Sequence, residues 1–162
     1  NEPCICCGTL TSVEEQTNMA FWSLWAAPLE IAADLRNIPA AAKAILQNRE
    51  VIAINQDSLV DQGRRVSRTP DGVQVWTKRL AGGSVAVLVF NANATAKVGA
   101  TFAFETVGFT SADRVRVRDV IRGVDLGEHV GGLALAEPVP GHGVAMFNAT
   151  VVWDEEPSRR EL

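Results

Sequence analysis

Residues 73–90 read VQVWTKRLAGGSVAVLVF, and this stretch decides the fold class of the second half of the chain. Valine or threonine stands at every second position of 73–77, the period of two that predicts a strand with one buried face. A glycine-rich turn follows at 81–84, and then the β-branched run 85–90. Two such runs joined by a short glycine turn predict an antiparallel hairpin.

Further short strands are predicted toward the C-terminus. Arginine and valine alternate from Arg114 to Arg118, which indicates one charged face and one buried face. Phe102 and Phe104 mark another strand, and residues 144–152 form the last one. Short strands separated by glycine turns predict an antiparallel β-sandwich of roughly 80 residues. The predicted organisation of this half is a linker at 61–72, the sandwich at 73–153 and a charged tail at 154–162.

The first 60 residues carry helical signals instead. Thr11 and Glu14 have the spacing of a capping box, and Ser12 with Glu15 offers an equally good register. An apolar stripe at helical spacing follows, made of Val13, Thr17, Ala20, Phe21, Leu24 and Trp25. Pro28 ends or kinks this helix, because proline lacks the N–H that the helix needs.

A second, alanine-rich helix is predicted from Pro39 to Gln47, with the proline in its first turn. Residues 51–54 are rich in β-branched side chains and predict a short strand or extended segment, which Asn55-Gln56-Asp57 closes. Helix, short strand and helix follow one another in the rhythm of an α/β layer. The segment holds about one and a half such repeats, too few to close a sheet or a barrel.

Composition narrows the function classes. With 47% hydrophobic and 21% charged residues, the 162-residue chain has the balance of one globular domain, or of a small one with part of another. A net charge of −4 provides no basic surface, so no nucleic-acid partner is predicted. The longest apolar run, 19–33, is interrupted by Ser23, Pro28 and Glu30, so no membrane partner is predicted. No signal peptide is visible, and because the first residue is not Met, this has no bearing on the parent protein.

The three cysteines lie together at Cys4, Cys6 and Cys7. A zinc site needs four ligands, and the two histidines, His129 and His142, are far away in the sequence and each alone. Neighbouring cysteines are badly placed to form a disulfide with each other. We therefore predict no metal and no cofactor, and the role of the cysteines stays open.

Several blocks of this chain resemble the C-terminal part of the α-galactosidases and α-N-acetylgalactosaminidases, the melibiase-type retaining glycoside hydrolases. Four blocks match in order and spacing: MAFWSLWAAPL at 19–29, ADLR at 33–36, VIAINQD at 51–57 and QG at 62–63. Looser matches lie at 87–91, 118–120 and 139–144. The resemblance covers nearly the whole chain except the first ten residues and the tail.

The resemblance implies an α+β fold, with the last strand and flanking helices of a (β/α)₈ barrel at 1–60, followed by the C-terminal antiparallel β-sandwich. A whole barrel needs about 250 residues, and both catalytic aspartates of the family lie on earlier strands. The implied catalytic residues of this chain are therefore none, and the chain alone is predicted to be inactive.

One piece of the family's sugar pocket is implied to remain. The family pattern Asn-Asp-Pro-Asp-Met reads Asn1-Glu2-Pro3-Cys4-Ile5 here, so Glu2 is the candidate substrate-binding residue. Cys4 replaces a carboxylate and Ile5 replaces a methionine. A solvated chain end is the competing interpretation of Glu2. The altered motif also fits a gene-model artefact, an exon-boundary error or a natural fragment.

The parent function that the resemblance implies is removal of terminal α-linked galactose from oligosaccharides or glycolipids. The alternatives are an α-N-acetylgalactosaminidase, or a noncatalytic β-sandwich module that binds carbohydrate or protein. The implied partner is a small-molecule carbohydrate, the resemblance allows a homodimeric parent, and the implied compartment is secreted or lysosomal.

Other residues invite functional interpretations that structural ones oppose. Asn93 and Asn148 begin glycosylation patterns, with Asn93 in a predicted loop and Asn148 on the last strand. Asp57 is expected to cap a loop and His142 to serve a turn of the sandwich. We expect Asp119 to partner the alternating arginines at a strand end. Of the four tryptophans, Trp22 and Trp25 are expected in the core, Trp76 outward or toward the barrel, and Trp153 is left without a place.

Overall fold

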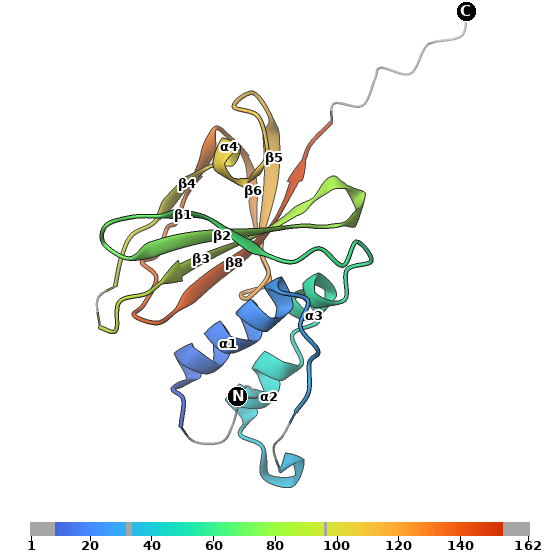
Figure 1. The fold of residues 1–162 in the computed structure, drawn as a ribbon, viewed down its shortest axis with the longest axis vertical. Helices are drawn as coiled ribbons and strands as arrows, with labels where there is room; N and C mark the ends of the chain where they lie inside the picture. Colours follow the sequence, from blue (N-terminus) through green and yellow to red (C-terminus); the bar gives the residue numbers. More distant parts are fainter. Residues whose placement is uncertain (1–8, 32–33, 96, 154–162) are drawn as a thin grey trace, which may run out of the picture.

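The computed structural model describes residues 9–31, 34–95 and 97–153 of the 162-residue chain (Figure 1). The helical elements are α1 (Ser12–Leu24), η1 (Leu35–Asn37), α2 (Ala40–Leu46), α3 (Arg49–Asn55), η2 (Ala81–Gly83) and α4 (Phe104–Val107). The strands are β1 (Arg64–Arg68), β2 (Val73–Arg79), β3 (Val85–Asn91), β4 (Thr101–Ala103), β5 (Arg114–Asp119), β6 (Val124–Val130), β7 (Gly132–Ala134) and β8 (Val144–Val151).

The strands form two antiparallel sheets, which confirms the predicted fold class. The larger sheet has the order β1-β2-β3-β8-β5-β6, and the smaller pairs β4 with β7. The predicted hairpin 73–90 is β2 and β3, with Val75 opposite Val89. Strand β8 lies between β3 and β5, so the last strand of the sandwich joins the hairpin to the arginine-rich strand.

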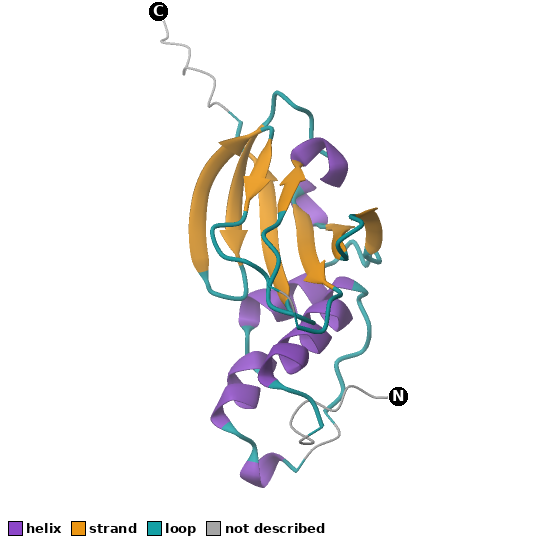
Figure 2. Cartoon of the chain, turned by 90° about the vertical axis from the view of Figure 1, so that its left-hand side faces the viewer, coloured by secondary structure: helices purple, strands orange, loops and turns teal. Residues whose placement is uncertain are grey.

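Both faces of the central strands are buried. Side chains of a strand alternate between faces, and Val87 and Val89 point toward the small sheet, together with Phe147. Ala86 and Leu88 point to the opposite face, where they pack with α1, α2 and α3. Figures 1 and 2 show these helices together below the strands. The sandwich and the helical layer thus share one sheet.

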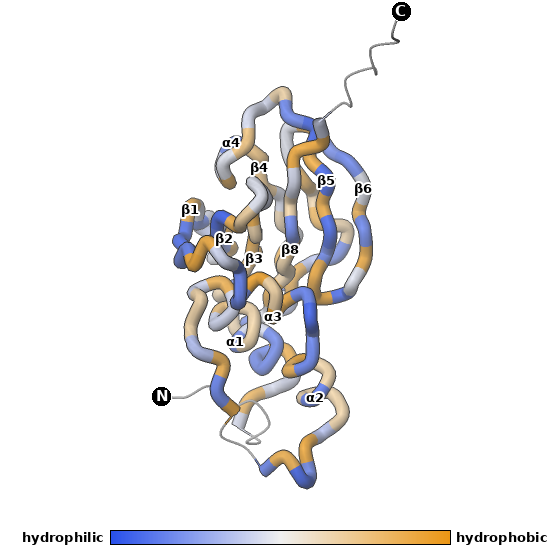
Figure 3. The backbone as a smooth tube through the Cα atoms, turned by 90° about the vertical axis from the view of Figure 1, so that its right-hand side faces the viewer, coloured by the Kyte–Doolittle hydropathy of each residue, from blue (hydrophilic) through white to orange (hydrophobic). Residues whose placement is uncertain are grey.

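Strand β5 keeps the predicted alternation, because its arginines stay at the surface while Val115 and Val117 are fully buried. Hydrophilic and hydrophobic residues follow one another along this strand in Figure 3. Asp119 is the exception, since it is buried at the strand end.

Helix α1 begins where one of the two predicted capping registers places it. The Thr11 hydroxyl accepts from the backbone N–H of Glu14, and the Glu14 carboxylate accepts from the backbone N–H of Thr11. The helix ends at Leu24, before Pro28, and Ala26 takes a left-handed conformation with φ 51°. Within the described residues, no helix is both long and apolar enough to cross a bilayer.

The predicted strand at 51–54 is wrong, since these residues belong to helix α3. The Asn48 side chain accepts from the backbone N–H groups of Glu50 and Val51 and so begins a helix there. Val51 and Ile54, three residues apart, then bury one helical face. Tertiary burial thereby overrides the β preference of the side chains.

The predicted linker also contains regular structure. Residues 64–68 form β1, which pairs antiparallel with β2 and places Arg64 opposite Thr77. The sequence of β1, RRVSR, is mostly arginine, so it lacks the apolar alternation that would have indicated a strand. The predicted charged tail, 154–162, lies outside the described residues.

Candidate functional site

The sequence-predicted pocket residue lies outside the described residues. Glu2 and the three cysteines all fall within 1–8. Among the described residues, several buried polar side chains, including Asn55 and Lys78, lie where the helical layer meets the sandwich.

Lys78 is the central residue of this interface. Its side chain points from β2 into the helical layer, and the residue is 1% exposed. The Nζ group donates to the backbone oxygen of Ile54 at 2.5 Å and to that of Ser23 at 3.3 Å. These carbonyls lie in the last turns of α3 and α1, where helix dipoles favour a cation. Burial lowers the pKa of Lys78, while the charges of Asp57 and Asp61 oppose that shift.

Two residues of the block at 51–57 fix the same interface. The Asn55 amide donates to the carbonyl oxygens of Trp22 at 3.1 Å and Ala27 at 2.8 Å, so it ties α3 to the end of α1. Asp57 accepts from the backbone N–H groups of Leu59 and Ala81, both at 3.0 Å. The prediction that Asp57 caps a loop is confirmed.

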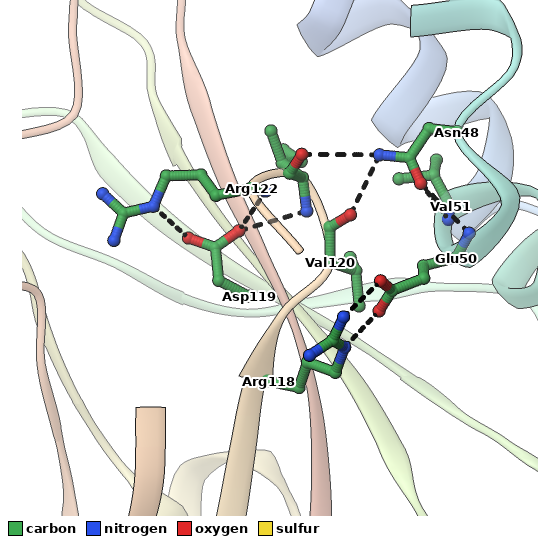
Figure 4. Close-up of polar contacts among 8 residues, drawn as sticks. Asn48, Glu50, Val51, Arg118, Asp119, Val120 and Arg122 are labelled. Atoms are coloured by element: carbon green, nitrogen blue, oxygen red, sulfur yellow. Dashed lines mark hydrogen bonds and ion pairs between the residues drawn. The ribbon is translucent and has the colours of Figure 1, made fainter. Parts of the chain in front are cut away.

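The other end of α3 is joined to the end of β5 (Figure 4). Arg118 donates to both carboxylate oxygens of Glu50, at 2.6 and 2.7 Å. This hydrogen bonding lowers the pKa of Glu50 and raises that of Arg118. Asn48, which caps α3, also donates to the carbonyl oxygen of Val120 at 2.9 Å. Helix α3 therefore carries polar contacts to the sandwich at both of its ends.

Asp119 does not partner the alternating arginines as expected. Arg116 pairs with Glu128 on β6 and Arg118 with Glu50, whereas Asp119 pairs with Arg122, Nε to Oδ2 at 3.0 Å. Asp119 is buried at the strand end, and its carboxylate also accepts hydrogen bonds from the backbone N–H groups of Ile121 and Arg122 in the following turn.

A cavity of about 340 Å³ opens beside this turn, and Asp119 and Glu137 both line it. Two carboxylates at one cavity are what a glycosidase needs, with the sugar between them and about 5 Å separation in retaining enzymes. Here Arg122 bridges them, with Nη1 2.8 Å from a Glu137 oxygen. Because the guanidinium holds both carboxylates, the arrangement supports the turn and provides no free acid and nucleophile.

The two glycosylation patterns lie in different surroundings. Asn93 follows β3 in a loop, and its Nδ2 donates to the carbonyl oxygen of Asp71 at 2.6 Å and to the side chain of Asn91 at 2.9 Å. Asn148 lies within β8, opposite Ala86 on one side and Arg118 on the other.

The histidines have structural partners. His129 Nε2 lies 3.0 Å from the carbonyl oxygen of Leu126, and His142 occupies a turn with φ 55°. Among the described residues, no group of three or more histidine, cysteine or acidic side chains is placed to hold a metal.

Among the described tryptophans, Trp25 departs from expectation, whereas Trp76 takes one of its two expected directions, toward the helical layer. Trp22 is half-buried, but Trp25 is 39% exposed, so its expected place in the core is wrong. Trp76 faces α1 and contacts Phe21 with ring centroids 5.3 Å apart. Sequence reasoning missed the burial of Lys78, although its position in step with Trp76 on β2 was a usable signal.

Comparison with known proteins places these features in a family context. The model described as "Alpha galactosidase A" matches residues 4–57, and the one described as "Alpha galactosidase C-terminal beta sandwich domain" matches residues 70–149. Alpha-galactosidase 3 of Arabidopsis thaliana is 34% identical over 145 residues, 88% of this chain and 33% of the relative. Alpha-N-acetylgalactosaminidase of Gallus gallus is 35% identical over 114 residues, 70% of this chain and 28% of the relative.

The crystal structure of alpha-galactosidase I from Mortierella vinacea superposes with a TM-score of 0.83 at 26% identity. That superposition covers 90% of this chain and 37% of the other. The chain therefore spans only about a third of the length of the relatives that it matches.

Proposed function

The chain belongs to the α-galactosidase family of glycoside hydrolases, and on that premise we propose that it forms part of an enzyme that removes terminal α-linked galactose from oligosaccharides or glycolipids. One observation carries this proposal. Two family matches follow each other in the chain, and the structure folds the corresponding segments into a helical layer and a sandwich that share one sheet.

The role proposed for this chain within such an enzyme is support. The sandwich holds α1 and α3 through Lys78, Asn55 and the Arg118–Glu50 pair. Helices fixed in this way present their remaining face to the rest of a barrel. The catalytic carboxylates are proposed to lie outside these 162 residues, because the described cavity with two carboxylates is bridged by Arg122.

A second substrate class is suggested by the α-N-acetylgalactosaminidase relative. The α-N-acetylgalactosaminidase relative is 35% identical to this chain over 70% of its length, against 34% over 88% for the α-galactosidase relative. Terminal α-linked N-acetylgalactosamine is therefore the alternative substrate. A homodimeric parent and a secreted or lysosomal compartment are proposed on the family resemblance alone. Glu2 as a pocket residue and glycan attachment at Asn93 and Asn148 likewise stay proposals.

Turnover of chromogenic substrates tests the function. We expect the complete parent protein to hydrolyse a nitrophenyl α-galactoside faster than the corresponding α-N-acetylgalactosaminide, and the 162-residue chain to hydrolyse neither. A parent protein inactive on both substrates would contradict the hydrolase function. Turnover by the chain that disappears in Asp119→Asn would contradict the supporting role, because it would assign catalysis to the cavity that Arg122 bridges.

A further inference from the structure

A groove of about 320 Å³ runs along α1 on the side that faces the sandwich. One face of the helix lines it, and the ends of two sandwich segments close it. The lining residues are Leu10, Glu14, Thr17, Asn18, Phe21, Trp25, Phe90 and His142. Its volume is at the lower end of the range of small-molecule sites.

One end of the groove is aromatic. The Phe21 ring lies 4.9 Å from Trp25 and 5.3 Å from Phe90, measured between centroids. Trp76 supports Trp25 from the sheet at 6.0 Å. These contacts hold the indole in place, yet the Trp25 residue is 39% exposed. A large aromatic side chain held rigidly with an open face is a platform for an apolar surface of a ligand.

The other end of the groove is polar. The Asn18 side chain, half-buried one turn from Phe21, makes no hydrogen bond to any described residue. Glu14 lies one turn further along and accepts from Thr11, while its Oε1 is 3.1 Å from His142 Nδ1. Hydrogen bonds from the Thr11 backbone and from His142 lower the pKa of Glu14 to about 2, so the carboxylate is ionised at neutral pH. The groove thus offers an unused amide beside a fixed negative acceptor.

We propose that this groove is a noncatalytic carbohydrate-binding site that takes a single pyranose ring. A pyranose has an apolar C–H face and an edge of hydroxyl groups. The face matches the exposed indole of Trp25, and the hydroxyl groups match the Asn18 amide and the Glu14 carboxylate. An aromatic platform with a few placed polar groups is the usual composition of small-molecule sites. A purely apolar ligand would leave the Asn18 amide unpaired, which disfavours it.

Binding to the 162-residue chain tests the proposal. Methyl α-galactopyranoside is the first probe, a choice that rests on the proposed function, and methyl α-glucopyranoside is the second. Tryptophan fluorescence and saturation-transfer NMR are measured during each titration. We expect saturable binding with a Kd of about 1 mM, a strength appropriate to a small ligand in an open groove. Saturation transfer should be strongest at the ring C–H protons.

Two variants locate the site. Trp25→Ala should weaken binding about tenfold and Asn18→Leu about fivefold, because they remove the platform and one hydrogen bond respectively. Trp153→Phe, at a residue 80% exposed and outside the groove, should bind as the wild type does. Circular dichroism verifies that each variant is folded. Asn18→Leu keeps the side-chain volume, so it still tests the site if Trp25→Ala does not fold.

Saturable binding of either glycoside that Asn18→Leu weakens supports the groove. Absence of saturation by both glycosides up to 50-fold above that Kd, or equal binding by wild type and both groove variants, overturns it. Neither result bears on the hydrolase function, because that is measured by turnover of the complete parent protein.

Discussion

The ammonium group of Lys78 lies 2.5 Å from the carbonyl oxygen of Ile54. A cation on strand β2 of the sandwich therefore caps the C-terminal end of helix α3. The same group reaches Ser23 at the end of α1. One residue of β2 therefore donates hydrogen bonds to two helices, and the two accepting residues, Ser23 and Ile54, are 31 positions apart in the sequence.

Lys78→Met should destabilise the chain by about 2–4 kcal/mol, because the carbonyl groups of Ile54 and Ser23 lose the buried donor that Lys78 supplies. Methionine keeps much of the stem's volume, so the loss reports the ammonium group. Urea unfolding followed by circular dichroism measures the change. Lys43→Met on α2 is the matched control, since Lys43 is exposed and should shift stability by less than about 0.5 kcal/mol. Equal effects of the two substitutions would contradict the role of Lys78.

The case of Lys78 shows why the sequence predicted the strands better than the layers. The alternation in 73–77 identified β2 correctly but left open whether its second face meets solvent or the barrel segment. In the structure helices cover that face, so Lys78 and Trp76 are turned toward α1. Period-two patterning reports the strand and does not report what packs on its second face.

Sequence signals predicted the structure correctly where the stabilising interactions join residues close together in the sequence. The Thr11–Glu14 capping box needs only four residues, and it formed as predicted. The strand predicted at 51–54 is wrong because the Asn48 side chain caps a helix there, and burial of Val51 and Ile54 against α1 stabilises that helix. The groove was missed because Trp25 was assigned to the core, and its exposure depends on where α1 ends relative to the sheet.

Gly63→Ala should cost about 2–3 kcal/mol, because a Cβ at this position would lie 2.4 Å from Leu24 Cγ. The Gly63 N–H also donates to the Leu24 carbonyl oxygen at 2.9 Å, so the backbone has little room to retreat. Gly99→Ala is the control, since nothing lies within 4 Å of its Cβ position. Thermal unfolding of both variants checks this, and a Gly63→Ala chain as stable as Gly99→Ala would refute the close approach.

The Arg118–Glu50 pair should show a small favourable coupling energy in a double-mutant cycle of Arg118→Ala and Glu50→Gln. Both side chains are partly exposed, at 43% and 36%, so solvent screens the pair and a larger value is not expected. The control cycle uses Arg36 and Asp34, which are 86% and 50% exposed and pair only locally, and it should give a coupling near zero. Indistinguishable couplings in the two cycles would mean that the Arg118–Glu50 pair does not help to join α3 to the sandwich.

Acid should weaken the Thr11 cap of α1, and with it the contact to His142, through Glu14. Its pKa is lowered from 4.5 to about 2 in the folded chain, so folding favours the carboxylate over the acid. The stabilisation is therefore complete above the unfolded value and is lost as pH falls from 4.5 toward 2. Glu14→Gln preserves the capping box, because glutamine also fits its third helical position, but it removes the charge. The gap in unfolding free energy between wild type and Glu14→Gln should be largest at pH 6 and should close progressively below pH 4.5.

Glu105→Gln, at an exposed residue of α4, provides the matched comparison by urea unfolding at each pH. A gap for Glu14→Gln that stays constant down to pH 2.5 would show that the charge of Glu14 stabilises neither the Thr11 cap nor the contact with His142.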